Sequence, residues 1–135
     1  RGATMEIQLW TLLGGVLLPY FWAGAATRFK KEQLGSVDLG APRVQSEQLE
    51  GIGARAWGAQ MNAWEALGVF LAANLAALMV GVDPNGAWAY ACMVWLIGRV
   101  AHGVFYIGGQ AMMRVAAFLV GTTSSVSIFV MAFIA

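Results

Sequence analysis

Residues 54–86 read ARAWGAQMNAWEALGVFLAANLAALMVGVDPNG and decide the fold. The part from 54 to 82 is an apolar run longer than the about 20 residues that an α-helix needs to cross a bilayer. It ends in Asp-Pro-Asn-Gly at 83–86, which favours a tight turn because proline presets φ and Asn or Gly accepts a positive φ. The stretch therefore predicts a membrane helix followed at once by a second, antiparallel one.

The sequence on both sides contains three more runs of the same kind. The four predicted spans cover about 5–27, 54–82, 87–107 and 111–135, and the one sizeable polar connection covers 28–53. A β-barrel would instead show shorter strands of alternating hydropathy. The predicted fold is an all-α membrane protein, a four-helix bundle that forms one domain over 1–135.

Composition supports a membrane protein and excludes other classes. Of the 135 residues, 59% are hydrophobic and 11% charged, whereas soluble domains carry about 25% charged residues. The net charge is +1, and the main basic cluster is Arg28, Lys30 and Lys31, so nucleic acid is not an expected partner. The single Cys92 can close no intramolecular disulfide and supports no multi-thiolate metal site.

The basic residues also predict the orientation. Four spans place both termini on one side, and Arg28, Lys30, Lys31, Arg43 and Arg114 all fall on the side of the long loop. By the positive-inside rule this loop is cytoplasmic, and the termini are periplasmic or lumenal. We expect an integral, multi-pass protein in contact with membrane lipids, in a bacterial inner membrane.

Two of the predicted spans carry a polar stripe. The residues are Arg55, Asn62 and Glu65 in the second span, and Arg99, His102 and Tyr106 in the third. At about 100° per residue, each set falls on one helix face. Ionisable groups at this depth are costly unless they pair or face water. Glu65 lies roughly 16 Å from the loop side and Arg99 roughly 12 Å, which predicts a structural ion pair between them.

Positive charge exceeds negative charge in these stripes. One intramembrane carboxylate faces up to four arginines, Arg28, Arg55, Arg99 and Arg114, which favours an anionic ligand that enters from the cytoplasm. The alternative is that the stripes only fix helix register. His102 is a satisfied polar residue or a base. Tyr106 is a hydrogen-bond donor to a thiol or an interfacial anchor.

Two motifs in these stripes resemble one family. Arg55-Ala-Trp-Gly-Ala-Gln-Met-Asn62-Ala-Trp-Glu65, followed by Phe70, resembles the second-helix signature of the MAPEG family, the membrane-associated proteins in eicosanoid and glutathione metabolism. Arg99-Val-Ala-His102-Gly-Val-Phe-Tyr106, with Arg114 beyond it, is similar to the family's third-helix stretch. Arg28-Phe-Lys30-Lys31 is similar to the basic end of its first helix.

The resemblance implies a homotrimer that binds glutathione as co-substrate between neighbouring subunits, near the cytoplasmic side. Positions that match the family's glutathione site are Arg28, Asn62, Glu65, His102, Tyr106 and Arg114. It implies that Arg28 and Arg114 hold carboxylates and that Glu65 holds the ammonium. Tyr106 and Arg114 would promote the thiolate that attacks a lipophilic small molecule, while Arg99 is a structural partner.

The sequence also departs from the family pattern. Gly58 stands where many members carry another arginine, and Met61 stands where glutathione-using relatives have a basic or polar residue. The spacing from Tyr106 to Arg114 differs by a residue from one branch of the family. Fewer cationic anchors predict weaker glutathione binding.

Two classes of function follow from these observations. The first is a glutathione-dependent transferase or peroxidase acting on lipophilic electrophiles or lipid hydroperoxides. The second is a non-catalytic structural or lipid-binding subunit of a larger membrane complex. A small transporter or channel is the remaining alternative, and substrate flux in liposomes would identify it.

Overall fold

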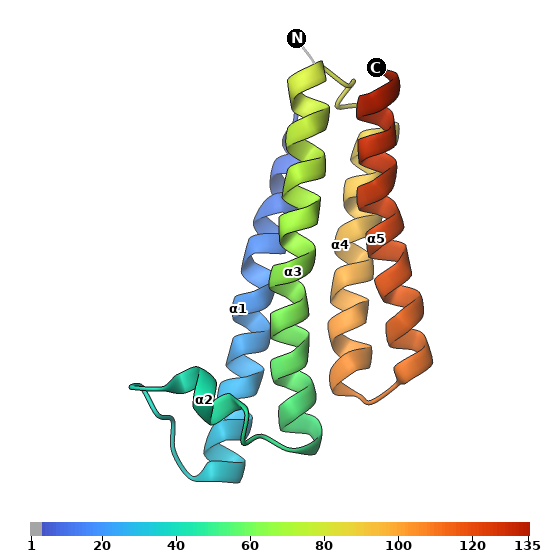
Figure 1. Ribbon diagram of the computed structural model, residues 1–135. Helices are drawn as coiled ribbons and strands as arrows, with labels where there is room; N and C mark the ends of the chain where they lie inside the picture. The colour runs from blue at the N-terminus through green and yellow to red at the C-terminus, as the bar shows by residue number, and fades with distance from the viewer. Residues whose placement is uncertain (1–3) are drawn as a thin grey trace.

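The computed structural model describes residues 4–135, which form five α-helices. They are α1 (Glu6–Leu34), α2 (Pro42–Ser46), α3 (Gly51–Val80), α4 (Ala87–Ile107) and α5 (Ala111–Ile134). The four long helices are apolar enough to cross a membrane, and they run side by side with the short α2 at one end (Figure 1). The predicted all-helical membrane bundle with four spans is therefore confirmed.

The turn between α3 and α4 is built as its residue types predict. Gly81 ends α3 with φ of 76°, and the N–H of Val82 donates to the carbonyl of Ala77 at 3.0 Å. The N–H of Asn85 then donates to Oδ1 of Asp83 at 2.9 Å. These local bonds reverse the chain, so that α3 and α4 are antiparallel.

The first helix ends at Leu34, seven residues beyond the predicted boundary at 27. Loss of hydropathy at Arg28 does not end the helix, since Nε of Arg28 and Oε1 of Glu32 form an i,i+4 salt bridge at 2.7 Å. Gly35, with φ of 81°, ends it, and the Gly35 N–H donates to the carbonyl of Lys31. The other predicted span boundaries lie within three residues of the observed helix ends.

The core has two parts along the bundle. Towards the α3–α4 turn, the rings of Phe70 and Trp95 stack with centroids 3.7 Å apart. Towards the opposite end, which carries α2 and is called here the loop end, Trp22 of α1 packs directly against Gly103 of α4, where a side chain would have no room. This close approach fixes α4 against its neighbours and so positions its polar face.

Candidate functional site

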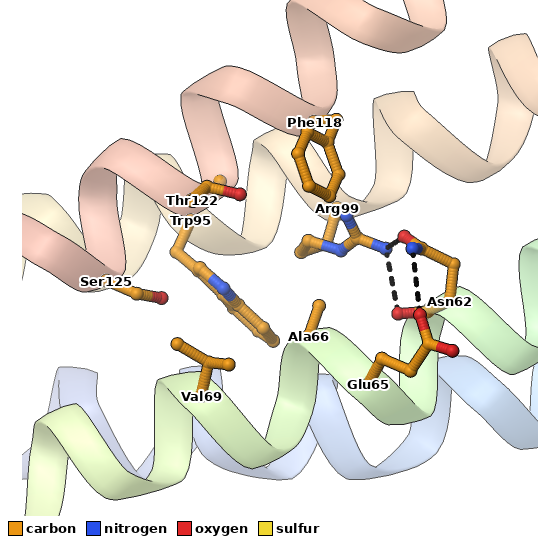
Figure 2. A pocket seen from close by; sticks show the side chains of 10 residues that line it. Asn62, Glu65, Ala66, Val69, Trp95, Arg99, Phe118, Thr122 and Ser125 are labelled. Atoms are coloured by element: carbon orange, nitrogen blue, oxygen red, sulfur yellow. Dashed lines mark hydrogen bonds between the residues drawn. The ribbon is translucent and has the colours of Figure 1, made fainter.

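The polar faces of α3 and α4 meet in the loop-end half of the bundle. Nη2 of Arg99 donates to Oδ1 of Asn62 at 2.6 Å and to the Asn62 main-chain carbonyl at 3.3 Å. Nδ2 of Asn62 donates to Oε2 of Glu65 at 3.3 Å. Figure 2 shows these side chains reaching towards one another from the two helices. The antiparallel arrangement thus places Arg99 beside Asn62.

The direct Glu65–Arg99 ion pair expected from the sequence is not formed. Within residues 4–135, the structure has one salt bridge, and it joins Arg28 to Glu32. Asn62 lies between the two charges because Glu65 follows it by three residues and is turned outward, with an exposed side chain. The guanidinium and the carboxylate are therefore coupled through an amide.

Arg99 also orients His102, one turn further along α4. Nη2 of Arg99 lies 3.4 Å from Nδ1 of the buried His102. A guanidinium has only donors, so this contact is a hydrogen bond in the tautomer that leaves Nδ1 unprotonated. The ring of Tyr106 contacts the His102 ring edge-on, with centroids 5.5 Å apart. The α4 stripe is therefore a connected polar row.

Five of the six residues matched to a glutathione site line one cavity of about 510 Å³, called here the polar cavity. They are Asn62, Glu65, His102, Tyr106 and Arg114. The guanidinium carbon of Arg114 lies 4.6 Å from the centroid of the Tyr106 ring, which places a positive charge against the phenol. A cavity of this size is within the range of small-molecule sites.

The sixth residue, Arg28, does not line this cavity. Its exposed side chain lies on α1 and pairs with Glu32. A smaller cavity of about 160 Å³ adjoins the polar cavity and is lined by Arg55 together with Tyr106 and Arg114. Nε of Arg55 donates to the carbonyl of Ile107 at 3.0 Å. Among the described residues of one chain, the polar cavity is therefore lined by one arginine, Arg114, and the adjoining small cavity adds Arg55.

Gly58 has a packing role that the sequence did not reveal. A Cβ at this position would lie 2.6 Å from the hydroxyl oxygen of Tyr106. No side chain fits there unless Tyr106 moves, so an arginine at 58 and this position of Tyr106 exclude each other. The departure from the family pattern at Gly58 is the condition that lets the phenol lie against α3.

The cavity also has an apolar wall that sequence reasoning missed. Trp57 and Met61 of α3, with Val115 and Phe118 of α5, complete its lining. Met61 lies four residues before Glu65 and Phe118 lies four residues after Arg114, a spacing that places each pair on one helix face. Such spacing equally describes a core face, and Trp57 and Val115 have no such spacing from Asn62, Glu65 or Arg114.

A search of curated proteins found no match to this chain. The model of the MAPEG family matches residues 7–134, which include all four long helices except the first residue of α1. The family includes glutathione-dependent transferases and peroxidases. The match covers nearly the whole chain, together with both polar stripes and the cavity between them, and the protein therefore belongs to the MAPEG family.

Proposed function

We propose that this protein is a glutathione-dependent membrane transferase or peroxidase that acts on lipophilic electrophiles or lipid hydroperoxides. One observation carries the proposal: Glu65 and Arg114 line the same cavity as the phenol of Tyr106, and neither charge is used in a salt bridge within the described residues. Two opposite charges around a cavity, neither of them held in a salt bridge in the described part of the chain, suit a ligand that carries both signs.

The charges of glutathione fit this set of side chains. Glutathione has two carboxylates and one ammonium group. Glu65 would hold the ammonium and Arg114 one carboxylate, while Asn62 and His102 supply further hydrogen-bonding atoms. For the second carboxylate we propose Arg28 of a neighbouring copy in a homotrimer, because Arg28 does not line the cavity of its own chain.

Glutathione supplies a thiol nucleophile. The protein would favour the thiolate form of glutathione through the positive charge of Arg114 and a hydrogen bond from the Tyr106 hydroxyl. Phe118 and Val115 form the apolar side of the cavity, where a lipophilic partner would arrive from the bilayer. Each co-substrate would thus approach from the phase in which it dissolves.

We propose that the loop end faces the cytoplasm of a bacterial cell, with both termini on the other side of the inner membrane. The positive-inside rule supports this orientation. The polar cavity lies in the loop-end half, where Arg55 and Arg114 also lie. Glutathione would then reach the site directly from cytoplasmic water.

The test measures glutathione binding and turnover on the purified chain in nanodiscs. Binding is followed by the glutathione-dependent rise in melting temperature, and turnover with 1-chloro-2,4-dinitrobenzene. Arg114→Ala should weaken glutathione binding about tenfold or more, because a hydrogen bond to a charged group contributes about 1.5–3 kcal/mol. Lys31→Ala is the matched control, since this exposed cation lines neither cavity.

Failure takes two distinct forms. If the wild-type chain shows neither a glutathione-dependent shift nor turnover with any tested electrophile, the proposal is wrong. If glutathione binds and Arg114→Ala leaves its affinity unchanged, Arg114 is not part of the site. Assembly, measured by native mass spectrometry, should be the same in all three proteins.

A further inference from the structure

A third cavity, of about 240 Å³, lies next to the polar cavity, between α3, α4 and α5, and is called here the deep cavity. The two cavities share Asn62, Glu65 and Phe118. The deep cavity then continues along α3 to Val69, about one helical turn further from the loop end. Figure 2 shows Asn62 and Glu65 at one end of it and Val69 and Ser125 at the other.

The deep cavity has a buried floor and an open rim. The floor is formed by Trp95, Arg99, Gly121 and Ser125, all of which are buried. The rim residues Glu65, Val69, Phe118 and Thr122 are exposed. The cavity therefore opens sideways between α3 and α5, at a level that lies within the membrane span. Its volume exceeds that of the roughly 150 Å³ apolar cavity that holds one benzene molecule.

One buried polar atom in this floor has no partner. Arg99 is 2% exposed; its Nη2 is bonded to Asn62, but its Nε has no hydrogen-bond partner. Buried N–H groups are rarely left in this state, because removal from water without a replacement acceptor costs free energy. The side chain that carries this N–H forms part of the cavity wall (Figure 2). An acceptor atom inside the cavity would satisfy it.

The lining indicates what kind of molecule would carry that acceptor. Ala66, Val69, Trp95 and Phe118 form an apolar wall, which favours a ligand with an apolar body. The polar lining residues are Asn62, Glu65, Arg99, Thr122 and Ser125. A second anion would lie near the Glu65 carboxylate, which already offsets the charge of Arg99 through Asn62. A neutral oxygen on an apolar body meets both conditions.

We propose that the deep cavity binds an apolar small molecule with one neutral oxygen acceptor, such as a carbonyl, epoxide or hydroperoxide, to which Nε of Arg99 donates a hydrogen bond. This makes Arg99 a recognition residue in addition to a partner of Asn62. That this ligand is the second substrate rests on the function proposed above. That the ligand binds in the deep cavity does not depend on that function. The binding is therefore measured without glutathione.

The experiment titrates the full chain in nanodiscs with three nine-carbon probes, against empty nanodiscs. The probes are 2-nonanone, nonane and nonanoate. The wild-type chain should bind 2-nonanone about tenfold or more tightly than nonane, which lacks the acceptor. It should also bind 2-nonanone more tightly than nonanoate, which brings a second anion to Glu65.

Two variants test the site by independent routes. Arg99→Met removes the donor and should abolish the preference for 2-nonanone over nonane. Ala66→Phe leaves Arg99 and Asn62 in place but fills the cavity, and it should weaken 2-nonanone binding about tenfold or more. Ala72→Phe makes the same change on an exposed part of α3 away from the cavity and should leave binding unchanged.

The outcomes separate this inference from the function proposed above. Equal affinity of the wild-type chain for 2-nonanone and nonane would overturn it, as would full 2-nonanone binding by Ala66→Phe. Nonanoate that binds as tightly as 2-nonanone would overturn the neutral character of the ligand. If the preference for 2-nonanone is found in a chain that does not bind glutathione, the inference stands and the proposed function fails.

Discussion

Gly58 and Tyr106 show how one missing side chain positions a functional one. A Cβ at Gly58 would meet the Tyr106 hydroxyl oxygen at 2.6 Å, whereas a Cβ at Gly68, on the same helix, meets nothing within 4 Å. Gly58→Ala should therefore displace the phenol from the polar cavity. Loss of one hydrogen-bond donor to a developing charge typically lowers kcat by about 10²-fold or more, so turnover with glutathione should fall at least about tenfold.

Gly68→Ala is the control for this prediction. Both changes replace a helical glycine by alanine and so alter helix propensity equally. If Tyr106 is displaced, Gly58→Ala should lose turnover and Gly68→Ala should not. Both variants should still fold, as shown by a cooperative thermal unfolding transition. Equal turnover in the two variants would show that the Tyr106 hydroxyl contributes nothing to the reaction.

At the scale of the elements, Asn74 joins α3 to α4 deep in the membrane span. Its Oδ1 accepts hydrogen bonds from Nε1 of Trp88 at 2.9 Å and from Sγ of Cys92 at 3.2 Å, and all three residues are buried. Asn74→Leu would leave the Trp88 N–H without an acceptor. The free energy of unfolding should fall by about 1–3 kcal/mol, measured by denaturation in mixed micelles.

A double variant identifies the cause. If the loss comes from the orphaned indole N–H, Asn74→Leu combined with Trp88→Phe should cost less than the sum of the two single changes, since the N–H is then absent. Strict additivity would mean that Asn74 acts through packing alone. Turnover should be little affected throughout, because neither residue lines the polar cavity.

At the scale of the whole molecule, Glu65 carries an exposed charge within a helix that is apolar enough to cross a membrane. Its carboxylate is exposed on α3, beside the exposed side chains of Met61 and Trp64, at a depth where lipid would surround it. A charge in hydrocarbon is costly, so a neighbouring subunit is expected to cover this face. Native mass spectrometry should give closed trimers, three times the 14.4 kDa of one chain.

Mixed trimers test whether the site is shared between subunits. If Arg28 of one subunit and Arg114 of the next serve one glutathione, co-expressed Arg28→Ala and Arg114→Ala chains should form some sites with both arginines intact. Glutathione binding would then partly recover relative to either variant alone. No recovery in confirmed mixed trimers would place both residues in the same subunit's site or exclude Arg28 from it.

Four spans, the antiparallel turn at 83–86 and the faces that hold Asn62, Glu65, His102 and Tyr106 followed from the sequence. These properties are local, because the length of an apolar run, turn chemistry and the 3.6-residue helical repeat depend on neighbours along the chain. The same reasoning placed the end of the first helix at 27, since hydropathy reports the membrane boundary, whereas capping at Gly35 decides where the helix stops.

Only the tertiary structure decided which polar groups meet. Arg99 bonds to Asn62 instead of Glu65, and the cavity that collects Tyr106 and Arg114 is not lined by Arg28. The unpartnered Nε of Arg99 likewise emerged only when α3, α4 and α5 were packed. The physical reason is that neighbouring positions on a helix differ by about 100°, so the relative rotation of two packed helices selects each partner, and the local pattern of either helix does not encode that rotation.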